Sequence, residues 1–159
     1  MSTIWSYHEK LKDCALSALT GAFVGSGAYR DVYRMRHADH LVLKIEARGM
    51  TFSNAHEWSI WQEVQGTKWE KWFAPCVSID GYGAVLVQHR TMPPTREQWN
   101  ELKRVPAFLA DLKPSNFGML DGRIVAHDYG NHNFLGLGIE NAKLVSSKAI
   151  KHGSCELDG

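Results

Sequence analysis

The sequence has few cysteines, few prolines and no long hydrophobic run. Its three cysteines, Cys14, Cys76 and Cys155, are far apart and odd in number. This pattern is typical of reduced thiols and argues against a disulfide framework. No apolar stretch approaches the roughly 20 residues that a membrane helix needs, and the N-terminal residues lack the basic-then-apolar order of a signal peptide. We therefore expect a cytoplasmic protein without membrane attachment.

Neither sign of charge dominates the chain. Lysine and arginine together number 18 and aspartate and glutamate 17, giving a formal net charge of +1. This balance offers no general electrostatic case for binding nucleic acid or a membrane surface. Apolar residues make up 44% and charged residues 22% of the chain, which is ordinary for a globular protein. The length of 159 residues suits a single domain spanning residues 1–159.

The N-terminal part of the chain changes from a helical to a strand pattern. Apolar residues at helical spacing predict a helix over residues 4–19, and Gly21 would end it. From residue 22 to residue 46, short apolar runs separated by turn residues predict a three-stranded antiparallel meander. Asp39 and His40 are expected at the turn between its last two strands.

A second helix and two further strands follow. Apolar residues at helical spacing predict a helix over Thr51–Gln65. Ser53 or Asn54 would cap this helix, because both residue types accept hydrogen bonds from free backbone amides. Two short strands are predicted over residues 75–79 and 84–88, on either side of a glycine-containing turn.

A proline-containing break separates these elements from the rest. Met92-Pro93-Pro94 interrupts the chain as a linker would. The pattern of residues 95–104 then predicts a short helix with Thr95 as its cap. Asp121-Gly122, between the strand patterns 116–120 and 123–126, is a strong signal for a tight hairpin.

The order of these elements predicts an α+β fold with two lobes. The first lobe, residues 22–90, would contain a five-stranded antiparallel sheet and one main helix. A hinge at 91–94 would lead into a reduced second lobe, residues 95–159, made mostly of loops and helix. The cleft between two such lobes is the natural place for a ligand.

Two glycines lie at the first turn of the predicted meander. Gly25 and Gly27, in Gly25-Ser26-Gly27-Ala28-Tyr29-Arg30, would let the backbone approach a phosphate closely. Val32 would pack over a nucleotide base, and Arg30 could itself contact phosphate. A plain hairpin turn is the alternative interpretation of the same residues.

A lysine lies inside an apolar strand pattern. Lys44, in Val42-Leu43-Lys44-Ile45-Glu46, would be unfavourable to bury without a partner of opposite charge. Glu57 in the following helix is the preferred partner, and Glu63 is the second choice. The alternative is that Lys44 simply faces solvent.

The segment Asp111-Leu112-Lys113-Pro114-Ser115-Asn116 brings an aspartate, a lysine and an asparagine within six residues. The hairpin after it leads directly to His127-Asp128-Tyr129-Gly130. Taken with Lys44 and the glycine turn, these segments resemble, in order and spacing, the motifs of the protein-kinase-like superfamily. A generic polar turn is the alternative for the first segment.

The resemblance implies a role for each matching residue. Asp111 would orient or deprotonate the attacking hydroxyl, and Lys113 would neutralise the transferring phosphoryl group. Asn116 and Asp128 would bind Mg²⁺, and Lys44 would contact the phosphates of ATP with Glu57 as its partner. ATP and Mg²⁺ are therefore the expected cofactors.

The sequence also departs from the family pattern. Leu109-Ala110 stands where these kinases have His-Arg, and Arg30 replaces the third glycine of the glycine-rich loop. No Ala-Pro-Glu follows Asp128, so the usual helical platform for a peptide substrate is not expected. Compact kinase-like proteins of this sort resemble ones from bacteriophages and bacteria, in which case the location would be the host cytoplasm.

Two functions are compatible with this pattern. The first is an ATP- and Mg²⁺-dependent phosphotransferase whose acceptor is a serine or threonine of a partner protein, or a small molecule. The second is a non-catalytic, pseudokinase-like module that inhibits or scaffolds a partner protein. The tryptophan-rich segment 58–72 could supply an exposed anchor for such a partner, but packing in the core is the more common role of tryptophans at this spacing. A second lobe this small leaves an exposed face that is compatible with a homodimer.

Overall fold

The computed structural model describes residues 13–46, 51–109, 111–130 and 142–147. Residues 13–19 are helical, and the first strand already begins at Thr20, so the predicted N-terminal helix ends before Gly21. The part of that prediction over residues 4–12 lies outside the described residues. None of the helices in the described part is long and apolar enough to span a bilayer.

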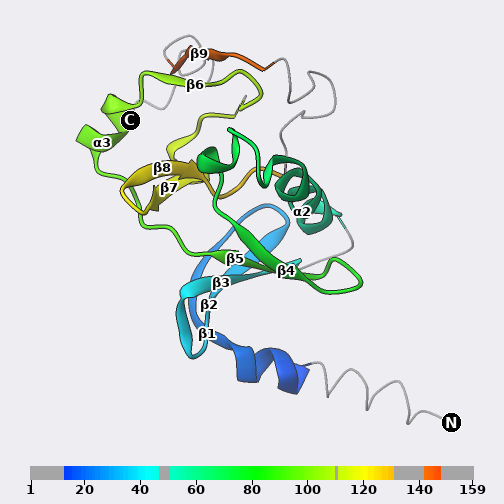
Figure 1. The fold of residues 1–159 in the computed structure, drawn as a ribbon. Coiled ribbons are helices and arrows are strands. Elements are labelled where there is room, and N and C mark those ends of the chain that lie inside the picture. The colour runs from blue at the N-terminus through cyan, green and yellow to red at the C-terminus, as the bar shows by residue number, and fades with distance from the viewer. Residues whose placement is uncertain (1–12, 47–50, 110, 131–141, 148–159) are drawn as a thin grey trace, which may run out of the picture.

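The predicted five-stranded antiparallel sheet is confirmed. Its strands occur in the order β1-β2-β3-β5-β4 and every neighbouring pair is antiparallel. The strands are β1 (Thr20–Ser26), β2 (Arg30–Met35), β3 (Ala38–Glu46), β4 (Cys76–Ile79) and β5 (Val85–His89). Figure 1 shows this sheet in blue, cyan and green, with helix α2 (Ser53–Val64) beside it. Helix α2 contacts β3, β4 and β5.

The turn between β2 and β3 lies earlier than predicted. Arg36 and His37 form it, and His37 takes a left-handed backbone conformation with φ of 64°. Asp39 and His40, predicted at this turn, are the second and third residues of β3 instead. Turn propensity favoured Asp39, but the register of the β2–β3 ladder places the reversal three residues earlier.

Helix α2 begins without the side-chain cap predicted for Ser53 or Asn54. Its N-cap residue is Phe52, which makes no side-chain capping bond. The free backbone amides of Thr51 and Asn54 instead donate to the carboxylate of Glu46, at 2.9 Å each. A carboxylate from the end of β3 therefore does the work of a local cap, and a negative charge at this end also suits the helix dipole.

The segment after the sheet contains more strand than predicted. Helix α3 (Arg96–Glu101) is shorter than expected, and Arg104 belongs to strand β6 (Arg104–Pro106), which pairs with β9 (Leu144–Ser146). Thr95 does cap α3, in a reciprocal capping box with Gln98.

The tight hairpin is confirmed. Strands β7 (Phe117–Leu120) and β8 (Arg123–Ala126) pair antiparallel. Asp121 and Gly122, with φ of 49° and 75°, both take the left-handed conformation that this two-residue turn requires. Two further bridges, Met92 to Met119 and Phe73 to Ala126, tie the hairpin to the linker and to the segment after α2.

One apolar core runs from helix α2 into the C-terminal part. Buried members from both regions belong to a single cluster: Ile60, Trp61, Val64, Trp69, Phe73, Leu86, Leu109, Leu112, Phe117 and Tyr129. Trp61 and Trp69 are buried within it, and Trp58 and Trp72 pack partly buried against it. The interpretation of these tryptophans as core residues is therefore confirmed, and segment 58–72 does not supply the exposed anchor that was its alternative.

Candidate functional site

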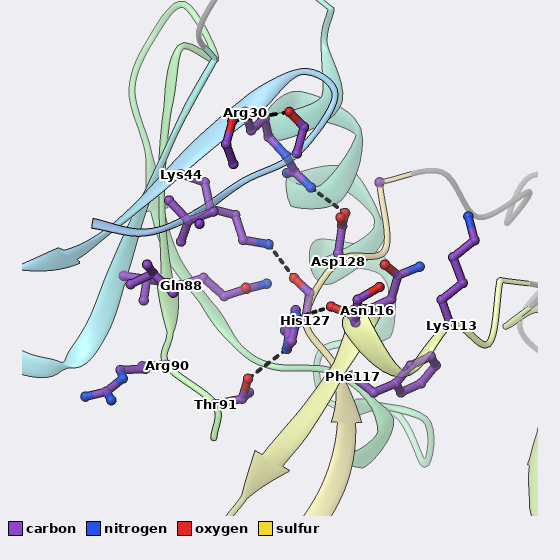
Figure 2. A pocket seen from close by; sticks show the side chains of 18 of the residues that line it. Arg30, Lys44, Gln88, Arg90, Thr91, Lys113, Asn116, Phe117, His127 and Asp128 are labelled. Atoms are coloured by element: carbon purple, nitrogen blue, oxygen red, sulfur yellow. Dashed lines mark hydrogen bonds and ion pairs between the residues drawn. The ribbon is translucent and has the colours of Figure 1, made fainter. Parts of the chain in front are cut away.

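A cavity of about 570 Å³ lies between the sheet and the segments that carry the polar motifs. This volume is within the usual range of small-molecule sites. Its walls come from the turn between β1 and β2, from β3, from residues 88–94, and from the two segments 111–117 and 127–130. Figure 2 shows these segments converging on one space. Elements far apart in the sequence therefore share a single site.

The structure brings the predicted site residues together. All of them except Glu57 line the cavity: Gly25, Gly27, Arg30, Val32, Lys44, Asp111, Lys113, Asn116 and Asp128. Glu57 is fully buried behind the cavity wall, where it bonds two of the lining residues.

Lys44 is buried and paired. Strand β3 alternates, so that Val42 and Lys44 line the cavity and Leu43 lies on the opposite face. The Nζ atom of Lys44 lies 2.5 Å from Oε1 of Glu57 and also donates to the backbone carbonyl of His127. The solvent-facing alternative for Lys44 was wrong, and Glu63, the second choice of partner, is exposed.

Glu57 accepts four hydrogen bonds in the protein interior. Oε1 accepts from Lys44 and from Nε2 of Gln88 at 3.0 Å. Oε2 accepts from Arg30 at 3.0 Å and from the backbone amide of Tyr129 at 3.2 Å. Burial on its own would raise the pKa of Glu57, but the charges of Lys44 and Arg30 outweigh it and lower that pKa. The carboxylate is therefore ionised and fixes both cations.

Arg30 makes a contact that the sequence did not reveal. Its Nη2 atom lies 2.5 Å from Oδ1 of Asp128, and its Nη1 atom donates to Oδ1 of Asn54 at 3.2 Å. Burial would lower the pKa of Arg30, but Glu57 and Asp128 together raise it. The ion pairs thus form a chain from Lys44 through Glu57 and Arg30 to Asp128. Figure 2 shows its last link, between Arg30 and Asp128.

The segment 111–116 approaches Asp128 through Asn116. The backbone carbonyl of Asn116 accepts from the amides of His127 and Asp128, at 2.9 and 3.2 Å. The side-chain nitrogen of Asn116 donates to the carbonyl of Asp111 at 3.4 Å. The side-chain oxygen of Asn116 takes no part in this bond. Asp111 pairs with Lys113 at 3.4 Å; because both side chains are partly exposed, this pair contributes little to stability.

His127 is a site residue to which the sequence gave no role. Its Nε2 atom lies 2.9 Å from the carbonyl of Ser115 and its Nδ1 atom 2.7 Å from the hydroxyl of Thr91. A carbonyl can only accept, so Nε2 carries the proton, and Nδ1 of the neutral ring accepts from Thr91. Burial, followed by the charge of Lys44, lowers the pKa of His127. Its position next to Asp128 was the one signal available in the sequence.

One part of the cavity is apolar. Val32 and Val42 contribute from the sheet, and the buried ring of Phe117 contributes from the hairpin. Aliphatic and aromatic side chains arranged in this way can enclose a flat, apolar ring, while the charged residues remain for an anionic group.

The residues present fit a single magnesium ion only in part. Asn116 and Asp128 can each offer a side-chain oxygen, and Mg²⁺ is commonly held by one or two protein oxygens together with substrate phosphates. One oxygen of Asp128 is already taken by Arg30. Within the described residues no group of three or more histidine, cysteine or acidic side chains gathers to hold a metal.

Neither a protein-family model nor a curated protein matches the sequence. The cavity and the residues that line it are therefore the basis for inferring a function.

Proposed function

We propose that the chain is an ATP- and Mg²⁺-dependent phosphotransferase of protein-kinase-like architecture. The five-stranded sheet with α2, the linker 91–94 and the β7–β8 hairpin between two polar segments follow the order that the resemblance implies. One observation carries the proposal: Lys44, paired with the buried Glu57, lines the same cavity as Asp111, Asn116 and Asp128.

The chemistry follows from the positions of these groups. Lys44 is held in place by Glu57 and would donate to phosphate oxygens. The amide of Gly27 already donates to the carbonyl of Arg30, so the turn between β1 and β2 would offer its other backbone amides. Asp111 would orient the acceptor hydroxyl and take its proton as the new O–P bond forms and the bond from the γ-phosphorus to the bridging oxygen breaks, so that ADP leaves. Lys113 would balance charge on the transferring group. Magnesium, when bound at Asn116 and Asp128, supplies the larger part of the charge neutralisation.

The acceptor is proposed only as a class. The side chain of Asp111 lines the cavity and is 32% exposed, so a serine or threonine of a partner protein, or a small molecule, can reach it. The side chain of Lys113 is 60% exposed, so that it can meet an acceptor from solvent.

A transfer assay tests the proposal. The protein is incubated with γ-labelled ATP and magnesium, alone and with a cell lysate, beside the variants Lys44→Met and Asp111→Asn. Removal of one such group should lower the transfer rate by about 10²–10³. Lys71→Met and Asp39→Asn are matched controls, because both residues are exposed and outside the cavity lining. Transfer that persists in both site variants would contradict the proposal.

A non-catalytic binding module is the second candidate, and the Arg30–Asp128 ion pair favours it. A metal ligand already bonded to a guanidinium is poorly placed to hold Mg²⁺. On this alternative, nucleotide would raise the melting temperature through binding but no label would be transferred. If nucleotide caused neither a rise in melting temperature nor label transfer, the remaining candidate would be a module that binds a partner protein without nucleotide.

A further inference from the structure

Arg30 lies where the glycine turn meets Asp128, and its guanidinium bonds the carboxylate expected to hold the metal (Figure 2). We infer that Arg30 is a built-in cation of the phosphate site, which allows a nucleoside triphosphate to bind without magnesium. The inference depends on the proposed nucleotide function and concerns the metal requirement of the same site.

Buried neighbours fix the position of Arg30. Only 8% of Arg30 is exposed, and its partners Asn54 and Glu57 are completely buried. The side-chain amide of Asn54 donates to the carbonyls of Lys44 and Ala84, at 3.0 and 3.1 Å. Because its nitrogen is used in this way, its oxygen must face Arg30. The guanidinium therefore has a fixed position in the site, whereas an exposed arginine can adopt many rotamers.

The guanidinium retains donors for a ligand. Arginine has five N–H groups in one plane. Two on Nη2 are used by Glu57 and Asp128, and one on Nη1 is used by Asn54. The N–H of Nε and the second N–H of Nη1 have no partner among the described residues. Arg30 lines the cavity beside Gly27, so either of these donors can bond a phosphate oxygen.

The local charge balance explains why this cation matters. Six other charged groups belong to this site: Lys44, Arg90, Lys113, Glu57, Asp111 and Asp128. Three of them are positive and three are negative, so without Arg30 their net charge is zero. A triphosphate would then meet no net positive charge unless a metal came with it. Arg30 makes the sum +1 and places a positive charge beside the phosphates.

Arg30 also limits what a metal can add. One oxygen of Asp128 is engaged at 2.5 Å, so a metal would share the remaining oxygen or displace the arginine. Displacement would leave the charge of Arg30 facing Glu57 alone. We therefore expect magnesium to strengthen nucleotide binding only slightly.

Binding of a fluorescent ATP analogue in excess EDTA and in excess magnesium tests this inference without relying on catalysis. For the unmodified protein, the two dissociation constants should agree within about threefold. In Arg30→Gly, which restores the glycine of the family pattern, binding in EDTA should weaken by tenfold or more, as expected for loss of a charged hydrogen-bond donor. Binding in magnesium should weaken much less. Arg30→Lys should recover part of the metal-free affinity.

Further variants guard against a folding defect. Arg34→Gly removes the same charge from an exposed position on the same strand and should leave both dissociation constants unchanged. Asp128→Asn keeps a hydrogen-bond acceptor for Arg30 but removes a negative charge, so metal-free binding should tighten.

Three results would overturn the inference. These are wild-type binding that needs magnesium, metal-free binding that survives Arg30→Gly, or metal-free binding that weakens in Asp128→Asn. If the unmodified protein bound no nucleotide under either condition, the proposed function itself would fall, and the inference with it.

Discussion

Gly118 on β7 lies directly against the side chain of Thr91, so a Cβ at Gly118 would overlap the hydroxyl and Cβ of Thr91. The same Cβ would lie 3.1 Å from Nδ1 of His127. The absence of a side chain at Gly118 thus allows the linker after β5 to pack on the hairpin, next to the bridge from Met92 to Met119. Two segments that border the cavity are joined at this contact.

Gly118→Ala should therefore destabilise the fold. The added methyl group must displace Thr91, and overpacking of this kind costs about 1–3 kcal/mol. Urea unfolding of the variant measures the loss. Gly81→Ala is the matched control, because a Cβ at Gly81 would meet nothing within 4 Å. Equal stabilities for the two variants would show that the linker can move away freely.

The stability of the protein should fall as the pH decreases below the usual imidazole range. Burial and the charge of Lys44 lower the pKa of His127 in the folded state below its ordinary value of 6.5. Below about pH 6.5 the unfolded chain therefore binds a proton that the folded chain does not, and the free energy of unfolding decreases. The negative charges of Asp128 and Glu57 favour the protonated ring and so raise the pKa of His127, but this effect is smaller than that of burial and Lys44.

His127→Gln isolates this contribution from those of the other histidines. The amide can still bond Ser115 and Thr91 but does not titrate, so the loss of stability between pH 7.5 and pH 5 should be smaller than in the unmodified protein. Denaturant unfolding at several pH values measures it. If the free energy of unfolding decreased with pH as steeply in His127→Gln as in the unmodified protein, His127 would have the same pKa in the folded and unfolded chain.

Loss of the Glu57 carboxylate should be severe. Glu57→Leu would leave Lys44 and Arg30 buried without their counter-charge, and breaking a buried ion pair in this way costs about 3–5 kcal/mol. That is a large part of the roughly 5–15 kcal/mol that stabilises a typical domain. Circular dichroism during thermal unfolding should show a much lower melting temperature or no cooperative transition.

Glu63→Leu provides the comparison within the same helix. Glu63 is exposed, so its replacement should change the free energy of unfolding by no more than about 0.5 kcal/mol. Similar effects of the two substitutions would contradict the assignment of Glu57 as the buried partner of both cations.

The sequence predicted the local parts of the fold well. The hairpin at Asp121-Gly122 followed from two residues that tolerate left-handed backbone angles, and the Thr95 cap depended on contacts three residues apart. Lys44 and Glu57 could be paired because one lies in a strand and the other in the helix that follows it.

Contacts between distant residues left no local signal. Arg30 and Asp128 are 98 residues apart, and only the folded chain shows that the arginine reaches the aspartate. The predicted cap of α2 was wrong for a related reason. The acceptor for the free amides comes from Glu46, outside the helix, and not from the local side chains that propensity favours. The tryptophans were ambiguous as well, because spacing alone does not say which face is buried.

Cys76 should be almost inert to alkylation, although Cys14 is exposed. Burial, followed by the negative charge of Glu57, raises the pKa of the Cys76 thiol to about 12. Only the thiolate reacts, and at that pKa its fraction is roughly a thousandfold below that of an ordinary cysteine with a pKa of about 8.5. Peptide mass spectrometry after timed iodoacetamide treatment at pH 8 should therefore find rapid labelling of Cys14 and very slow labelling of Cys76. In denaturant the two rates should converge; comparable rates without denaturant would show that the interior around Cys76 and Tyr129 opens readily.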